Sequence, residues 1–136
     1  MQYWLLKSEP STWSWQQQLQ VPSEPWTGVR NYQARNFMKK MQVGDLAFFY
    51  HSNEGKKIVG IVKVVKAYYP DPTDETQKFG CVDIAAVRSL KKSVSLSQIR
   101  LDPALENIPL LRQSRLSVMP ITPQEWNAIL EMETLG

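Results

Sequence analysis

The sequence predicts an α+β fold, in which several strands form a small β-barrel or a curved sheet with short helices between and around them. The first observation is the run IVGIVKVVKAYY at 58–69, whose β-branched residues are typical of a long strand. The second is a series of shorter apolar runs separated by turn residues, at 2–7, 45–52, 81–90 and 115–121. The third is the length of 136 residues, which is enough for one buried core. Residues 1–136 are therefore predicted to form a single domain.

The first third of the chain combines turn chemistry with helical patterns. A cap at Ser11 or Thr12 would begin a short helix through WSWQQQL, at 13–19. The segment VPSEPWTG at 21–28 holds two prolines and a glycine, so a loop is expected there. Within the stretch WTGVRNYQARNFMKKM at 26–41, a helix is expected after the segment TGVRN, and its buried face would be Ala34, Phe37, Met38 and Met41.

Turns and caps also order the rest of the chain. NEGKK reads as a hairpin turn between the 45–52 and 58–69 strands, and Gly60 indicates a bulge or a close backbone approach. The segment 70–77 is expected to be an exposed acidic loop, and 95–105 a short helix or loop. Thr122 begins a capping box that predicts a final helix with Pro at its first position.

Composition excludes several classes of protein. Cys81 and His51 are each the only residue of their kind, so neither an internal disulfide nor a zinc site is expected. No signal peptide or membrane span is visible, which favours a cytoplasmic protein. Residues 1–68 hold nine Lys and Arg against four Asp and Glu, whereas 69–136 hold seven against nine. A basic first half is compatible with an anionic partner.

The 26–41 stretch gathers groups that suit a nucleotide. Trp26 and Tyr32 offer flat faces on which a base can stack. Arg30 and Arg35 flank a helix start, where backbone N–H groups and guanidinium groups favour a phosphate. The alternative is a solvated helix face with Trp26 as a loop anchor, and the pattern alone leaves both interpretations open.

Two strand ends are further candidates, as is Arg115 at the start of the last strand, although an isolated arginine there is unremarkable. Lys7, Ser8 and Glu9 follow the first strand, and they form either a polar binding edge or a plain surface ion pair. His51 and Ser52 end the FFYHS strand, where His51 is either a structural residue or a reader of a ligand's polar edge.

Five segments together carry a family resemblance: YWLLKSEPSTWSW, WTGVRNYQARNFMKKMQVGDLAFFYHS, GIVKVVKAYYPDPT, VDIAAVRSLKKSVSL and RLSVMPITPQEW. In this order they closely resemble the EVE domain family, over about residues 2–131. The resemblance implies a PUA-like fold, a small β-barrel with peripheral short helices.

The resemblance also implies a function. DNA or RNA carrying a modified base is the expected partner, with 5-methylcytosine the leading candidate, and the base would be flipped into an aromatic-lined pocket without metal, cofactor or catalysis. By matching motifs, the pocket would use Ser8, Glu9, Trp26, Asn31, Tyr32, Tyr50, His51 and Ser52. The phosphates or the pocket rim would be served by Lys7, Arg30, Arg35 and Arg115.

Two other functions remain open at this stage. Lys7 and Glu9 could act as they would in a hydrolase of modified nucleosides similar to ASCH proteins, although no nucleophile–base pair is visible. Alternatively, the domain could bind a small molecule or a protein unrelated to nucleic acid.

Overall fold

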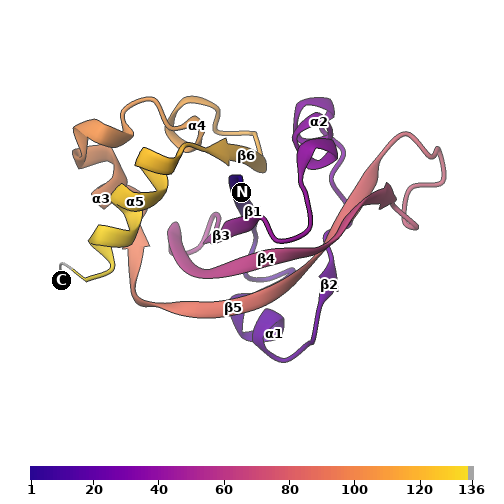
Figure 1. Ribbon diagram of the computed structural model, residues 1–136, viewed down its shortest axis with the longest axis horizontal. Coiled ribbons are helices and arrows are strands. Elements are labelled where there is room, and N and C mark those ends of the chain that lie inside the picture. The colour runs from indigo at the N-terminus through magenta and orange to yellow at the C-terminus, as the bar shows by residue number, and fades with distance from the viewer. Residues whose placement is uncertain (135–136) are drawn as a thin grey trace.

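The computed structural model describes residues 1–134 and shows an open mixed sheet of six strands in the order β2-β5-β4-β3-β1-β6 (Figure 1). The strands are β1 (Tyr3–Ser8), β2 (Glu24–Pro25), β3 (Leu46–His51), β4 (Lys57–Pro70), β5 (Gly80–Ser95) and β6 (Val118–Ile121). The helices are α1 (Trp15–Leu19), α2 (Tyr32–Lys40), α3 (Leu96–Leu101), η1 (Pro103–Leu105), α4 (Pro109–Arg112) and α5 (Pro123–Met132). This is the predicted α+β, PUA-like fold.

Strand pairing fixes which chain segments meet. β1 runs parallel to β3, from Tyr3 opposite Leu46 to Ser8 opposite His51, so the ends of these two strands lie side by side. β2 has two residues and pairs with β5, with Glu24 opposite Ile84. Within residues 1–134 no pairing joins β2 to β6, so the predicted barrel is instead a strongly curved but open sheet.

The long β4–β5 hairpin bends over the core through several register shifts. One of them lies between Ile58 and Gly60, and a Cβ built on Gly60 would lie 2.2 Å from Cζ2 of Trp15. Both features predicted for Gly60, a bulge and a close approach, are therefore confirmed. Because the indole of Trp15 rests on this glycine, α1 is held against β4 and β5.

Capping side chains set the helix starts. α1 begins at Trp15 because Ser14 and Gln17 form a capping box, so the predicted Ser11 or Thr12 cap is wrong. α2 begins at Tyr32, capped by the Asn31 side chain, directly after the TGVRN segment where the helix start was expected. The capping box predicted at Thr122 starts α5 as expected.

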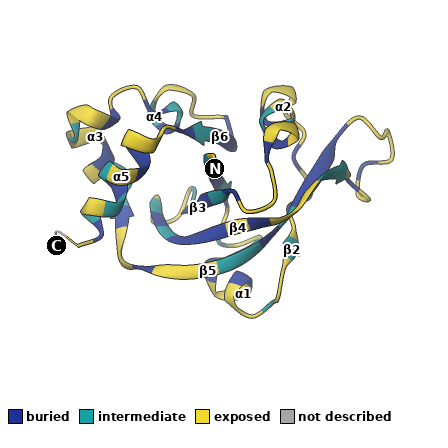
Figure 2. Cartoon of the chain, viewed as in Figure 1, coloured by how far each residue is buried: buried dark blue, intermediate teal, exposed yellow. Residues whose placement is uncertain are grey.

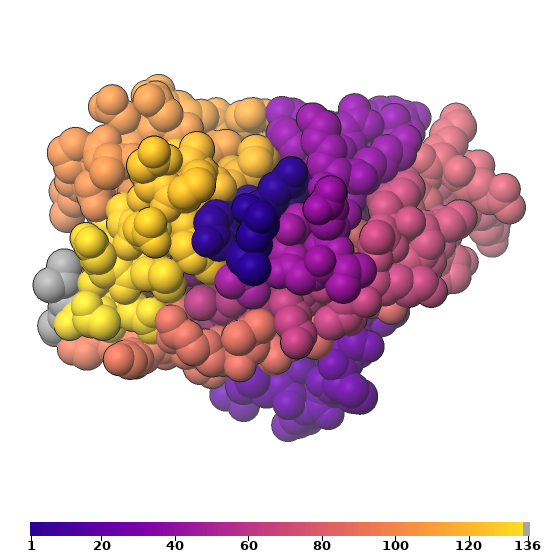
Figure 3. Space-filling model, viewed as in Figure 1, coloured from indigo at the N-terminus to yellow at the C-terminus, as the bar shows by residue number. Residues whose placement is uncertain are grey.

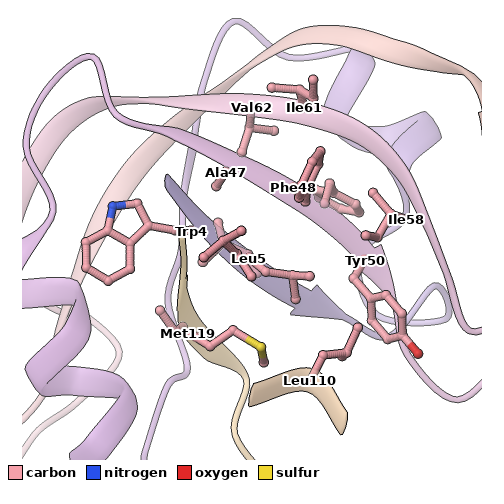
Figure 4. Packing of buried hydrophobic residues seen from close by; sticks show 14 of the residues in the cluster. Trp4, Leu5, Ala47, Phe48, Tyr50, Ile58, Ile61, Val62, Leu110 and Met119 are labelled. Atoms are coloured by element: carbon pink, nitrogen blue, oxygen red, sulfur yellow. The ribbon is translucent and has the colours of Figure 1, made fainter. Parts of the chain in front are cut away.

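Buried side chains pack on both faces of the central strands. Phe48 stacks on Trp126 under α5, and Phe49 packs against Trp15 on the opposite face of β3. Figure 2 shows β3 buried along most of its length and β4 buried mainly in its first half, while the helices expose their outer faces. Figure 4 shows Leu5, Phe48 and Ile58 in the same cluster. The predicted α2 stripe also packs inward, with Ala34, Met38 and Met41 buried and Phe37 half-buried.

The first residues lie on the surface between α5 and the α2 region (Figure 3).

The prediction of an exposed loop at 70–77 is wrong for its two aspartates, since Asp71 and Asp74 are 2% and 8% exposed. Each accepts hydrogen bonds from nearby loop groups, which offsets the cost of burying a carboxylate. None of the helices in residues 1–134 is long and apolar enough to span a membrane.

Candidate nucleic-acid interface

A cavity of about 550 Å³ opens where β1 ends. This volume lies within the usual range for ligand sites. Three chain segments meet there: the end of β1 with the following turn, the segment from β2 to Arg30, and the residue before β6. The lining residues are Lys7, Ser8, Glu9, Thr12, Trp13, Glu24, Pro25, Trp26, Thr27, Gly28, Val29, Arg30 and Ser117.

The end of β1 is fixed by hydrogen bonds on both sides. The Ser8 hydroxyl donates to the carbonyl of Trp13, and the Ser8 carbonyl accepts from the N–H of Ser52. Lys7 Nζ donates to the carbonyl of Ser114 at 2.9 Å, which ties β1 to the segment before β6. Burial lowers the pKa of the Lys7 ammonium group. These bonds hold one wall of the cavity in place.

Two indole rings form the aromatic part of the lining. Trp26 is 8% exposed and meets the ring of Phe49 edge-on, at 5.7 Å between centroids. Trp13 is half-buried, and its Nε1–H donates to Gln18 Oε1 at 2.9 Å. Flat aromatic surfaces of this kind suit the stacking of a base. Trp26 was predicted at the pocket, whereas Trp13 was not named as a site residue.

α1 positions Trp13. The backbone N–H of Trp15 donates to His51 Nε2 at 3.1 Å, and Trp15 Nε1 donates to Ser89 Oγ at 2.8 Å. These two bonds, with the contact to Gly60, anchor the start of α1 to three strands. The chain just before it, including Trp13, is therefore held at the cavity.

The opposite wall, residues 26–30, is anchored by a buried carboxylate. Asp71 accepts from the N–H of Gly28 at 2.8 Å and from Arg30 Nη1 at 3.1 Å. Arg30 also donates to Thr73 Oγ1 at 3.0 Å. Burial alone would raise the pKa of Asp71, but hydrogen bonds from Thr73, Gly28 and Arg30 lower it below its ordinary value. Arg30 lies at the cavity as predicted, although its charge is paired with Asp71.

The cavity also holds two glutamates. Glu9 was predicted at the pocket, and its Oε1 accepts from Asn53 Nδ2 at 2.8 Å. Glu24 was not predicted; it is half-buried, and burial together with the nearby charge of Asp83 raises the pKa of its carboxyl group. Glu24 reaches this place only because β2 pairs with β5, a contact between segments far apart in the sequence.

The three predicted residues at the end of β3 lie outside the lining of this cavity. Tyr50 is 3% exposed in the core, beside Ile58 and Leu110 (Figure 4). His51 accepts from the Trp15 N–H, while burial and the charge of Lys57 lower the pKa of its imidazole. The His51 ring is therefore neutral near pH 7 and supports α1. Ser52 contributes its backbone N–H to Ser8.

The remaining predicted residues lie around α2. Tyr32 is 54% exposed, and its ring packs on Phe79. The guanidinium of Arg35 lies 4.7 Å from the centre of the Tyr32 ring and donates to the carbonyl of Lys78. Asn31 and Arg115 line a second hollow of about 290 Å³. This hollow adjoins the cavity, since Arg30 precedes Asn31 and Ser114 both lines it and binds Lys7.

The chemistry of the cavity favours binding. Its only hydroxyl groups are those of Ser8, Thr12, Thr27 and Ser117, and no histidine lines it to activate one of them. In residues 1–134 no group of three or more His, Cys, Asp or Glu side chains could hold a metal ion. The cavity offers stacking surfaces, hydrogen-bonding groups and cations.

An open mixed sheet with peripheral helices and an indole-lined cavity at one strand end defines a PUA-like binding domain. The chain belongs to the EVE domain family, whose model matches residues 2–132, which confirms the resemblance seen in the sequence.

Three relatives illustrate the match. A Rhodopseudomonas palustris protein solved by NMR is 50% identical, with a TM-score of 0.93 over 99% of this chain and 94% of that one. Thymocyte nuclear protein 1 of Gallus gallus is 38% identical, over 96% of this chain and 68% of that protein. Human THYN1, solved in complex with 5-methylcytosine-containing DNA, is 33% identical with a TM-score of 0.91, over 98% of each chain.

Proposed function

We propose that this protein is a binding module, without catalysis, for nucleic acid that carries a modified base, and that 5-methylcytosine in DNA is its first candidate ligand. The observation that carries the proposal is the similarity to human THYN1, which was solved with 5-methylcytosine-containing DNA and covers nearly the whole chain. The cavity lined by Trp13 and Trp26 also supports the proposal, because its lining offers aromatic and polar groups that could bind a single base.

The energetics of the cavity are compatible with an extrahelical base. Flipping a base out of a duplex costs a few kcal/mol, and least where the base is already unpaired. Stacking on an aromatic side chain returns about 1–3 kcal/mol per base. A methyl group buried in the cavity adds about 0.8 kcal/mol. We therefore expect a preference of a few-fold for the methylated base over unmodified cytosine.

The test is a fluorescence anisotropy titration with short oligonucleotides of one sequence. The panel holds single-stranded DNA, duplex DNA and RNA, each with cytosine or 5-methylcytosine at one central position. We expect the tightest binding for the methylated single strand, because no base pair has to be broken. Equal and negligible binding of every member would refute the proposal. Tighter binding of the RNA oligonucleotides would still support a module that binds a modified base, but would identify RNA as its ligand instead of DNA.

A further inference from the structure

One ionisable group in the cavity has no intramolecular partner. Among residues 1–134, the side chain of Lys7 is bonded to Ser114, that of Glu9 to Asn53 and that of Arg30 to Asp71, whereas the side chain of Glu24 makes no hydrogen bond or ion pair. Its carboxyl group is half-buried and lies in the same lining as the two indoles. The free carboxyl group at this place is therefore available to a ligand.

The backbone gives Glu24 a fixed position. It sits on β2, opposite Ile84, and the neighbouring Trp26 N–H donates to the carbonyl of Val82 at 2.7 Å. Trp26 is thus held to β5 by the same pairing that holds Glu24. The Trp26 indole and the Glu24 carboxyl group, which both line the cavity, are therefore only two residues apart on one segment that is fixed to β5.

From this geometry we infer that Glu24 is the specificity-determining residue that accepts a hydrogen bond from the exocyclic amino group of a cytosine-type base. An ionised carboxylate is only an acceptor. It therefore pairs with the amino group that cytosine carries at position 4, as Glu does elsewhere with cytosine N4. Thymine presents a carbonyl oxygen at that position, which would face the carboxylate with no proton between them. The inference rests on the proposed function and names the part of the base that Glu24 recognises.

5-Methylcytosine and thymine form a matched pair of probes, since both carry the methyl group and they differ only on the pairing edge. We expect wild-type protein to bind a short single-stranded DNA with one 5-methylcytosine about 5- to 150-fold more tightly than the same strand with thymine there. In Glu24→Gln the amide offers both a donor and an acceptor, so the ratio should approach one. In Glu24→Ala the 5-methylcytosine strand should lose most of this advantage. The substitution also removes a negative charge, which changes the affinity for both strands by the same factor because the strands have equal charge. This effect therefore cancels in the ratio of the two affinities.

Glu131→Gln is the matched control, because Glu131 is exposed on α5 and does not line the cavity. It should keep the wild-type ratio, and circular dichroism of all variants checks that they fold. A Glu24→Gln protein that keeps the full preference for 5-methylcytosine would overturn the inference while leaving the proposed function intact. A wild-type protein that binds both strands with equal affinity would also overturn the inference. Wild-type protein that binds neither strand would refute the proposed function, and this inference with it.

Discussion

The contact between Gly60 and Trp15 gives the sharpest prediction about how the fold supports the site. In Gly60→Ala the new methyl carbon would lie 2.2 Å from Cζ2 and 2.4 Å from Cη2 of Trp15. The indole has little room to move, because it is 6% exposed, packs on Phe49 at 5.1 Å and donates to Ser89. The substitution therefore forces the ring, and α1 with it, away from the sheet.

The magnitude follows from two opposing effects. Overpacking a well-filled core costs about 1–3 kcal/mol. Replacing a strand glycine by alanine returns about 0.5–1 kcal/mol through a less flexible unfolded chain. A contact of 2.2 Å puts the overpacking cost at the upper end of its range, so we expect Gly60→Ala to lower the free energy of unfolding by about 2 kcal/mol, measured by equilibrium urea denaturation. It should also weaken binding of a 5-methylcytosine strand, because Trp13 lies just before α1.

A double-mutant cycle separates the clash from a general strand effect. In a Trp15→Leu background the smaller side chain leaves space, so we expect a coupling energy of about 0.5–3 kcal/mol between the two sites. Gly44→Ala is the control: φ is +96° there and nothing lies within 4 Å of the added Cβ, so its cost is backbone strain alone. That cost should not change in the Trp15→Leu background. A Gly60→Ala protein as stable as wild type would refute the reasoning.

Three further predictions address the cavity and the C-terminal end. Trp13→Leu should weaken binding of a 5-methylcytosine strand about 5- to 150-fold in an anisotropy titration, because a stacking face is lost, whereas unchanged affinity would remove Trp13 from the site. Asp71→Asn should destabilise the protein by about 1–3 kcal/mol in urea, because one carboxylate serves both Gly28 and Arg30; a change of only a few tenths would argue against that anchor. Glu133 has its pKa lowered from the ordinary 4.5 to about 2, chiefly by hydrogen bonds from Arg88, so its contribution is complete above pH 4.5 and is lost as the pH falls towards about 2. Thermal unfolding of Glu133→Gln should accordingly be less pH-dependent than wild type in this window, and identical profiles would contradict the assignment.

Local sequence signals predicted the parts of the fold that depend on local energetics. The strand at 58–69 and the Thr122 cap both follow from residues close together in the chain. The start of α1 has a similar local signal, the S-x-x-Q box at Ser14, which competes with the caps predicted at Ser11 or Thr12. The buried aspartates had one as well, because D-P-T and D-E-T let each aspartate bond a threonine two residues on.

The site was harder to predict than the fold, because it depends on long-range pairing. Glu24 lies in a proline-flanked segment that reads as a loop, and only the β2–β5 contact brings it to the cavity. Trp13 reaches the cavity because Trp15 is pinned by residues far along the chain. Tyr32 has the composition of a stacking residue, yet it packs on Phe79, which follows the acidic loop. No pattern within one segment distinguishes these outcomes.

The most direct test of the account is an NMR titration that follows the indole N–H signals of selectively labelled tryptophans. Trp13 and Trp26 line the cavity, whereas Trp4 donates to Asp45 near the opposite end of β1 and Trp126 stacks on Phe48 in the core. Adding a single strand with one 5-methylcytosine should shift the Trp13 and Trp26 signals and leave those of Trp4 and Trp126 in place. Binding that leaves Trp13 and Trp26 unshifted would contradict the account, because the base would then bind elsewhere.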